Sequence, residues 1–479
     1  MSKSSVEFQV KRIISLLLEG GASDCILVGG SVRDQILGFQ PKDFDVEVYG
    51  LTYEMIISIL RRHYSYNVNF VGRSFGTIKI GSSIDISIPR VESKSGVGHR
   101  GFDVKCDPNL DLYSAFSRRD FTINAIGRRV DNSIYDPFDG VGDINRKILR
   151  APTDAFCEDP LRVLRGMQFA ARFGFSMDSK TIELCKRVFD EFNTLSVERV
   201  WGEWSKWALK GVELSRGLFV LRDTEWIQHF PEIADLINVT KIPTASVSGK
   251  ISADENAFTN TARICDIAAK IADRFNFDNE ERLTLIFSAL CYNMSGMNFS
   301  RGDDLSYQEL LELDAGFQSV NLSTRVKTPI LRLASRFLNR LKPPSVVVDK
   351  ILSTVGERLT NYFVTGERVF GDSCLRRLAT RLNPSSIKIW AALCRSIIEA
   401  NGKTDLIRQI EKCELRAEEL NIINCKPKPI LQGRDLIPKG VNPGKEMGKI
   451  LNNAYEAQLD GEFNNIDEAI IWYNNCYNK

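Results

Sequence analysis

The chain has 479 residues, more than one compact hydrophobic core supports, so we expect two to four domains or subdomains. Its composition, 43% hydrophobic and 26% charged, is that of an ordinary soluble globular protein. The formal net charge of +2 excludes a global basic field, so any contact with nucleic acid must come from local patches.

Several other classes of protein are disfavoured. No stretch approaches the ~18 consecutive apolar residues of a membrane span, and residues 1–7 lack the apolar core of a secretory signal. The 11 cysteines show no CxxC or CxxxC spacing, which argues against a zinc finger or a disulfide framework. We therefore expect reduced thiols, a cytoplasmic location and no membrane partner.

The first 150 residues alternate strand-like and helical patterns, and the later residues are helical throughout. An apolar helical spacing comes first, at Val10, Ile13, Ile14 and Leu17. Four predicted strands follow, at 25–28, 44–49, 77–80 and 84–88. Helical periods then dominate, for example at 161–173, 197–209, 262–275 and 387–400. The predicted fold class is α+β, with an α/β head on a long helical body.

The first predicted strand ends in a glycine turn. The sequence LVGGSVRD at 27–34 passes from an apolar strand through Gly29 and Gly30 into a helix. Glycines at such a junction let backbone N–H groups approach a phosphate, and the helix N-terminus adds positive dipole. Arg33 would add a charged fork. A plain strand-to-helix turn is the simpler interpretation.

Carboxylates follow closely on the second predicted strand. Because neighbours in a strand point to opposite faces, Asp43 and Asp45 share one face. Two such oxygen ligands suit Mg²⁺ that also binds a nucleotide's phosphates. If the strand at 84–88 pairs beside them, Asp85 becomes a third carboxylate. The pattern favours nucleotidyl transfer, with solvated surface acids as the alternative.

A second polar cluster follows a long polar stretch. Residues 90–111 are predicted to form a mobile loop. The sequence RRDFTIN at 118–124 then places Arg119, Asp120 and Asn124 within about one helical turn. Arginine suits phosphates, whereas Asp and Asn suit ribose hydroxyls. A helix start with surface charge is the alternative.

A third cluster begins a helix, with EDPLRVLR at 158–165. Asp159 and Arg162 are three residues apart and therefore face the same side. Carboxylate acceptors beside guanidinium donors can match the Watson–Crick edge of a base. A capping acid with an i,i+3 salt bridge is the simpler alternative.

These segments, in this order, resemble the motifs of the class II CCA-adding tRNA nucleotidyltransferases, a family shared with bacterial poly(A) polymerases. The matching segments are LVGGSVRD at 27–34 with DFD at 43–45, RRDFTINA at 118–125, DPFDG at 136–140 with Asp143, EDPLRVLRGMQFAARFGF at 158–175, and SVERV at 196–200 with Glu203. The tail, LQGRDLIPKGVNPGKEMGKIL at 431–451 with AQLDG at 457–461, also resembles the C-terminal segment of many members.

The resemblance implies an architecture. A polymerase-β-like nucleotidyltransferase head would occupy 1–150, and a helical neck with the nucleotide-selecting motif would occupy 151–240. A helical body at 241–425 and a helical tail at 426–479 would follow.

The resemblance also implies roles. Asp43 and Asp45 would hold catalytic Mg²⁺, with Asp85 as a further catalytic carboxylate. The nucleotide would be bound by residues of several motifs, namely Gly29, Gly30, Arg33, Arg119, Asp120, Asn124, Glu158, Asp159, Arg162 and Arg165. In the family the motif at 158–175 acts as an amino-acid template that selects CTP and then ATP. The implied reaction is template-independent addition of CMP, CMP and AMP to the 3′ end of tRNA.

Other activities of the same family stay open, namely A-only addition, CC-only addition and poly(A) synthesis. The polar stretch at 90–111 favours complete CCA or A-only addition, because CC-adding enzymes resemble relatives with a shortened loop. The modest net charge and the lack of a long basic tail disfavour a poly(A) polymerase. Intact Asp43 and Asp45 argue against a catalytically silent RNA-binding protein on this scaffold.

The middle of the chain departs from many bacterial relatives, which carry an HD-type metal phosphohydrolase domain. In the corresponding stretch, 256–296, Asn260-Thr261 stands at a His-Thr position and Tyr292-Asn293 at a His-Asp position. The chain has only 3 histidines, so the imidazole ligands of such a site are missing. We expect a structural or RNA-facing helical region without hydrolase activity.

Basic clusters in the helical part are candidates for contacts with tRNA. They are Arg332, Arg336 and Arg340, then Arg376, Arg377 and Arg381, then Lys426, Lys428 and Arg434. With a balanced total charge, each such cluster is more often a solvated helix face than a binding stripe. The sequence predicts no oligomeric state.

Overall fold

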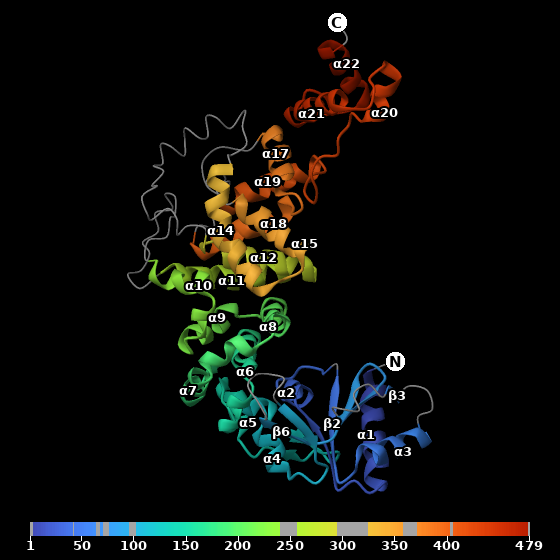
Figure 1. Ribbon diagram of the computed structural model, residues 1–479, viewed down its shortest axis with the longest axis vertical. Coiled ribbons are helices and arrows are strands. Elements are labelled where there is room, and N and C mark those ends of the chain that lie inside the picture. Colours follow the sequence, from blue (N-terminus) through green and yellow to red (C-terminus); the bar gives the residue numbers. More distant parts are fainter. Residues whose placement is uncertain are drawn as a thin grey trace. The chain divides into compact units, whose positions relative to one another are not determined.

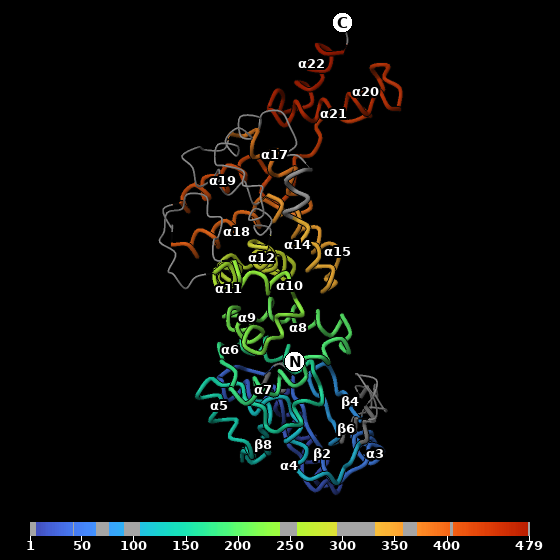
Figure 2. Tube along the Cα trace, turned by 60° about the vertical axis from the view of Figure 1, so that its left-hand side comes forward, coloured from blue at the N-terminus to red at the C-terminus, as the bar shows by residue number. Residues whose placement is uncertain are grey.

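The computed structural model describes residues 3–41, 43–63, 68–69, 76–94, 102–239, 256–294, 324–357, 371–402 and 406–477. The chain divides into two compact units, Met1–His229 and Phe230–Lys479, and each is described by itself. The strands belong to the blue-to-teal part of the chain, and the green-to-red part is helical (Figures 1 and 2). This confirms the predicted α+β class.

The first unit is built on a mixed sheet with the strand order β3-β4-β5-β2-β1-β8-β9. The strands are β1 (Asp24–Val28), β2 (Phe44–Tyr49), β3 (Val68–Asn69), β4 (Thr77–Ile80), β5 (Ile84–Ser87), β8 (Gly127–Arg128) and β9 (Ile134–Tyr135). Strand β2 runs parallel to β5 and antiparallel to β1. The four strands predicted from the sequence are therefore confirmed, and they are neighbours in the sheet.

Alternation along β2 gives the sheet one apolar and one polar face. Phe44, Val46 and Val48 are buried, whereas Asp45 and Glu47 between them are only half-buried. The predicted N-terminal helix is α1 (Lys3–Glu19), which packs against β1 and against α3 (Tyr53–His63). All four of its predicted apolar positions are buried, namely Val10, Ile13, Ile14 and Leu17. The side chains of Asp45 and Glu47 on the polar face of β2 are thus not part of the hydrophobic core.

The predicted mobile loop at 90–111 is wrong in part. Strands β6 (Arg90–Lys94) and β7 (Phe102–Cys106) form an antiparallel ribbon, in register from Arg90 opposite Cys106 to Lys94 opposite Phe102. The apolar–polar alternation of Phe102-Asp-Val-Lys-Cys106 is a strand signal that the polar composition of the stretch concealed. The glycines at 96, 98 and 101 lie outside the described residues.

Helices complete the first unit. They are α2 (Gly30–Ile36), α4 (Leu112–Ser117), α5 (Gly140–Arg146), α6 (Leu161–Phe173), α7 (Ser179–Arg187), α8 (Val197–Lys210) and α9 (Leu214–Asp223). Helix α6 packs against both α8 and α9. Its observed bounds equal the predicted 161–173, and Gly174 ends it in the left-handed conformation at φ 69°. Short strands β10 (Ile148–Leu149) and β11 (Ser176–Met177) pair with each other.

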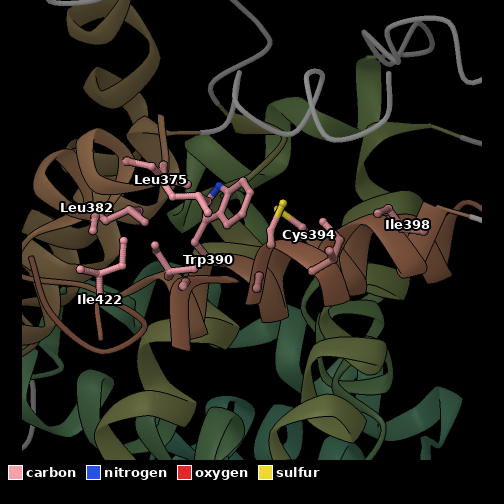
Figure 3. Close-up of a cluster of buried hydrophobic side chains, with 13 residues drawn as sticks. Leu375, Leu382, Trp390, Cys394, Ile398 and Ile422 are labelled. Atoms are coloured by element: carbon pink, nitrogen blue, oxygen red, sulfur yellow. The ribbon is translucent and has the colours of Figure 1, made fainter. Parts of the chain in front are cut away.

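The second unit is helical in its described part. Its helices are α10 (Pro231–Ala234), α11 (Ala257–Arg274), α12 (Asn279–Cys291), α14 (Thr324–Leu341), α15 (Ser345–Gly356), α17 (Asp372–Leu382), α18 (Ile387–Ala400), α19 (Ile407–Glu419), α20 (Gly433–Leu436), α21 (Lys445–Asp460) and α22 (Ile466–Tyr477). Trp390 of α18 lies in a buried cluster with Leu375, Leu382 and Ile422 (Figure 3). Helix α18 matches the predicted 387–400.

A separate hydrophobic cluster stabilises the C-terminal segment. It includes Leu431, Leu436, Ile450, Phe463 and Tyr473. The proposed boundary between body and tail, at 425–426, falls between this cluster and the cluster around Trp390. The boundary between neck and body, at 240–241, lies outside the described residues. The four-part division stays a prediction.

Two chain-wide properties complete the description. None of the 11 cysteines forms a disulfide. In the described part of the chain no helix is both long enough and apolar enough to cross a bilayer.

Candidate active site

The glycine turn lies between strand β1 and helix α2. Gly29 has φ 71° and ψ −140°, a backbone conformation that residues other than glycine rarely adopt. A methyl group placed on Gly29 would lie 3.7 Å from both Nη1 of Arg119 and Oδ2 of Asp45. The predicted strand-to-helix turn is therefore confirmed, and Gly29 sits between a guanidinium and a carboxylate.

The predicted carboxylates meet on neighbouring strands. Asp45 of β2 stands directly opposite Asp85 of β5, and exposed Asp43 precedes β2. Burial raises the pKa of the Asp45 carboxyl, and the negative charges of Asp85 and Asp43 raise it further. The positive charge of Arg119 lowers the pKa but does not cancel these effects. Asp85 is held by Lys79 at 3.1 Å. The pairing expected for the strand at 84–88 is confirmed, and the role of Asp85 stays a prediction.

A divalent cation fits this acidic face in chemical terms. Within the described residues, no group of three or more His, Cys, Asp or Glu side chains forms a complete protein cage for a metal. Mg²⁺ does not need one, because it is usually bound by one or two carboxylates together with waters and substrate phosphates. The like-charge repulsion that raises the pKa of Asp45 is relieved by a bound cation. Asp43 and Asp45 are suitable ligands for it.

Arg119 is fixed on two sides. Its Nη2 donates to Oε2 of Glu47 at 2.9 Å, and its guanidinium lies over the ring of Phe116 at 4.9 Å from the centroid. Glu47 also accepts a hydrogen bond from the hydroxyl of Tyr49. Sequence reasoning missed Glu47. The signal was present, because Asp43, Asp45 and Glu47 follow the two-residue period of one strand face.

Arg33 is placed differently from the charged fork that the sequence predicts. The residue is only 4% exposed, and its guanidinium lies against the neighbouring rings of Phe169 and Phe173 of α6, at 5.2 and 4.8 Å from their centroids. Nε and Nη2 donate to Asp34 and Nη1 donates to Asn124. A phosphate would have to compete with these partners. Arg33 therefore ties α2 to α6 in this structure.

The second predicted cluster is brought together as expected, by a short 3-10 turn at Thr122–Asn124. Nδ2 of Asn124 donates to Asp120 at 2.9 Å, and Nε of Arg165 donates to the other Asp120 oxygen at 2.7 Å. Burial opposes ionisation of Asp120, but Arg165 and Asn124 outweigh it and hold the pKa of the Asp120 carboxyl below its ordinary value. Side-chain hydrogen bonds thus run continuously from Arg33 to Arg165 on α6.

The predicted base-reading pair lies at the start of α6, but its members hold different partners. Asp159 accepts from the backbone N–H of Leu161 at 3.1 Å and from Arg199 at 2.9 Å. Arg162 donates to the carbonyl oxygens of Ala155 and Arg118, both at 2.6 Å. The alternative of a salt bridge between Asp159 and Arg162 is wrong for this structure.

Two further acidic side chains, Glu158 and Asp143, stabilise the same region. Glu158 pairs with Arg118 at 2.7 Å, which joins the third polar cluster to the second. Buried Asp143 accepts from the hydroxyl of Thr122 at 2.6 Å and pairs with Arg150 at 2.7 Å. The motif around Asp143 therefore holds the turn that carries Asn124.

The two segments compared with an HD site also meet, within the second unit. Nδ2 of Asn293 donates to Oδ1 of Asn260 at 3.2 Å and to the hydroxyl of Thr261 at 2.8 Å, and all three residues are buried. Asn260 in turn donates to Asn401 at 3.1 Å. These side chains are neutral, so the network lacks the imidazole and carboxylate ligands of a hydrolase metal site.

The predicted basic clusters differ in how many of their side chains form ion pairs within the protein. Arg377 pairs with Glu456 and Asp460 of α21, and Arg381 pairs with Glu357, so these two members of the cluster are engaged in internal ion pairs. Arg340 pairs with Glu232. Exposed cations remain at Arg332, Arg336, Lys426, Lys428 and Arg434.

Comparisons with known proteins agree with this geometry. Residues 25–150 match the family model described as the poly A polymerase head domain. A multifunctional CCA protein of Vibrio parahaemolyticus is 40% identical over 220 residues, 44% of this chain and 52% of that protein. The chain thus spans about half the length of several curated relatives that it matches. The multifunctional CCA protein of Mannheimia succiniciproducens is 32% identical over 311 residues, 63% of this chain and 70% of that protein.

Solved structures extend the likeness to nearly the whole chain. The Bacillus stearothermophilus CCA-adding enzyme in complex with CTP has a TM-score of 0.59 at 21% identity, over 97% of this chain and 96% of that one. The Thermotoga maritima CCA-adding enzyme complexed with tRNA has a TM-score of 0.58 at 16% identity, over 98% and 95%. At such identities the likeness shows a shared fold. Together with the match over most of the Mannheimia protein, it shows that this chain belongs to the family of the multifunctional CCA proteins.

Proposed function

We propose that this chain adds CMP, CMP and AMP to the 3′ end of tRNA, using CTP and ATP without a nucleic-acid template. One observation carries the proposal. Side-chain hydrogen bonds run from Arg33 of α2, the helix after the glycine turn, through Asn124 and Asp120 to Arg165 of α6. Helix α6 contains Arg162 in its first turn and begins directly after Asp159 and Pro160. Groups suited to phosphate chemistry and groups suited to base recognition are thereby held in one rigid site.

The proposed chemistry is an in-line displacement. The 3′-hydroxyl oxygen of the primer attacks the α-phosphate, a new O–P bond forms, the bond between the α-phosphate and the bridging oxygen breaks, and pyrophosphate leaves. Mg²⁺ bound by Asp43 and Asp45 would lower the pKa of the attacking hydroxyl and neutralise the leaving group. The Gly29-Gly30 backbone and Arg119 would hold the triphosphate. Asp85 would add negative charge to the cation site, and Asp120 with Asn124 would hold the ribose.

Base choice would depend on the start of α6. Cytosine and adenine both present an exocyclic amine beside a ring nitrogen that accepts a hydrogen bond. A carboxylate such as Asp159 can accept from the amine, and a guanidinium such as Arg162 can donate to the ring nitrogen. Uracil and guanine present a carbonyl and a ring N–H there, the reverse pattern. Glu158 and Arg165 would hold this end of the helix through Arg118 and Asp120.

The parts of the chain would divide the work. Residues 1–150 would carry the chemistry and 151–240 would select the nucleotide, while the body at 241–425 and the tail at 426–479 would bind tRNA. Relatives described as CCA-adding enzymes in complex with tRNA, CTP and ATP support these partners. We place the reaction in the cytoplasm, where tRNA is processed.

The A-only, CC-only and poly(A) activities remain rivals of the main proposal. Strands β6 and β7 pair with each other on either side of residues 95–101, and this supports the proposal of complete or A-only addition over CC-only addition. The relatives named as CCA proteins support complete addition.

Transcripts of tRNA that end at the discriminator base, at C or at CC separate these activities. Each is incubated with Mg²⁺ and with CTP, ATP or both. We expect all three to reach CCA when both nucleotides are present. Extension of the CC-ended transcript alone would show A-only addition, growth beyond CCA would show poly(A) synthesis, and arrest at CC would show CC-only addition.

The metal assignment predicts that Asp43→Ala abolishes addition. Loss of several kcal/mol of charge stabilisation corresponds to about a thousandfold lower rate. Single-turnover addition of AMP to a CC-ended transcript measures the effect. Asp190→Ala, an acid in the Phe189–Thr194 turn outside the proposed site, is the matched control. Near-normal addition by Asp43→Ala would contradict the assignment.

A further inference from the structure

Glu47 is the next side chain after Asp45 on the polar face of β2. It is 13% exposed, and both its carboxylate oxygens are engaged: Oε2 by Nη2 of Arg119 at 2.9 Å and Oε1 by the hydroxyl of Tyr49. In the neighbouring strand β5 it stands opposite Ser87, whereas Asp45 stands opposite Asp85. Glu47 is therefore an acid of this face whose charge is already paired with a guanidinium.

The partner of Glu47 is aimed at the glycine turn. Phe116, over which the Arg119 guanidinium lies, is fully buried in a cluster with Ile26, Val28 and Ala125. The ring therefore fixes the plane of the guanidinium, and Glu47 fixes one edge of it. Nη1, on the remaining part of the guanidinium, lies 3.7 Å from a methyl group built on Gly29.

We propose that Glu47, supported by Tyr49, is a positioning residue that holds the Arg119 guanidinium against the Gly29 turn, where it meets the triphosphate of the incoming nucleotide. The inference rests on the proposed function. Arginine has many rotamers, and a long side chain fixed before the ligand arrives loses less freedom on binding. A carboxylate whose charge and oxygens are taken by Arg119 and Tyr49 is a poor ligand for a cation, which separates Glu47 from Asp43 and Asp45.

The test compares Glu47→Gln, Arg119→Gln and the double variant with the wild-type chain. Binding of CTP and of ATP is measured by calorimetry without tRNA, and steady-state addition is measured with tRNA present. Because a charge-assisted hydrogen bond is lost, we expect Glu47→Gln to weaken both nucleotides about tenfold. KM should rise in proportion, kcat should change little, and the Mg²⁺ concentration for half-maximal rate should stay constant. The double variant should bind no more weakly than Arg119→Gln alone.

Two further variants complete the design. Glu183→Gln removes an exposed carboxylate of α7 that pairs with Lys186, and it should match the wild type in every assay. Tyr49→Phe removes only the support of Glu47, and it should weaken both nucleotides by about threefold. If thermal unfolding shows that Glu47→Gln does not fold, the nucleotide affinity of Tyr49→Phe alone tests the proposed role of Glu47.

Several outcomes would overturn the inference. Wild-type affinity in Glu47→Gln, or in Tyr49→Phe where that variant decides, would show that Arg119 needs no support. A raised Mg²⁺ requirement would make Glu47 a metal ligand, and additive losses in the double variant would show that Glu47 acts apart from Arg119. A wild-type chain that binds neither CTP nor ATP would refute the proposed function itself, which is a distinguishable result.

Discussion

At the residue scale, two arginines near the glycine turn differ through their partners alone. Arg33 is buried against two phenyl rings and donates hydrogen bonds to Asp34 and Asn124, so its guanidinium already has partners within the fold. Arg119 keeps Nη1 beside Gly29. Both occur in sequence motifs next to phosphate-binding signals. Only burial and hydrogen bonding distinguish Arg33, which holds elements of the fold together, from Arg119, which we propose to contact the triphosphate.

Gly29 is expected to tolerate no side chain. Gly29→Ala forces a β-carbon into a positive-φ conformation, at a cost of about 1–3 kcal/mol, and places a methyl group between Arg119 and Asp45. We expect a lower unfolding temperature and loss of nucleotide binding, measured by calorimetry. Gly440→Ala is the control, because Gly440 also has positive φ, at 83°, but lies in open space in the second unit. It should lose stability and keep nucleotide binding; equal binding in both variants would contradict the role of Gly29.

The lowered pKa of Asp120 leads us to predict that the stability of the fold depends on pH. Its pKa in the folded chain lies below the unfolded value of about 3.9, so ionised Asp120 stabilises the fold above pH ~4, and this contribution disappears as the pH falls through the folded pKa. Asp120→Asn should destabilise the chain by about 2 kcal/mol at pH 7, since Arg165 loses its charged partner. Unfolding temperatures measured from pH 7 to pH 3 should converge for the two proteins below pH ~4. A constant gap would contradict this assignment.

At the element scale, α6 joins both halves of the proposed site. Its bounds could be predicted to the residue, because Pro160 precedes it, Gly174 ends it and its apolar spacing is regular. Its role in the network could not be predicted in full. Arg172 at its last turn binds Asp34 of α2, a pair separated by 138 residues that no local pattern reveals. The β6–β7 ribbon shows the same limit, because its strands are stabilised by each other.

The brace between α8 and α6 predicts an effect on base choice. Arg199 of α8 holds Asp159, so Arg199→Ala would free the carboxylate that is proposed to accept from the amine of cytosine or adenine. We expect discrimination of CTP and ATP against UTP to fall about tenfold, because a well-placed pair is worth roughly 1–3 kcal/mol of selectivity. The ratio of kcat/KM values, measured with CC-ended and discriminator-ended transcripts, checks this. Arg187→Ala, which removes an exposed pair with Asp154, should leave the ratio unchanged; an unchanged ratio in Arg199→Ala would show that Asp159 needs no brace.

At the scale of the whole molecule, every residue proposed to bind nucleotide or metal lies in the first unit, Met1–His229. The second unit has its own hydrophobic clusters and a neutral network at Asn260, Thr261 and Asn293 in place of ionisable ligands. We therefore predict that the two units are separable in function. Nucleotide binding should belong to the first unit alone, and productive use of tRNA should require both.

A fragment of residues 1–229 tests the division. We expect it to bind CTP and ATP with the affinity of the full chain, because no proposed ligand-binding side chain is removed. Its KM for tRNA should rise at least about tenfold, because the phosphate contacts that we propose for the second unit would be lost. Calorimetry and steady-state addition measure the two properties. Extension of tRNA at the full-length KM would show that the second unit takes no part in tRNA binding.

The sequence by itself determined the α+β class, the four central strands, helices at 161–173 and 387–400, and the family resemblance. These features depend on local spacing, on alternation and on turn-forming glycine, which a chain carries without its fold. Only the tertiary structure determined which charged side chains pair with one another. In the folded chain Arg33 is buried, Arg119 pairs with Glu47, and the side chains of Asp159 and Arg162 have different partners. Those partnerships join residues distant in sequence, and the free energy of an ion pair depends on burial and geometry that exist only once the chain is folded.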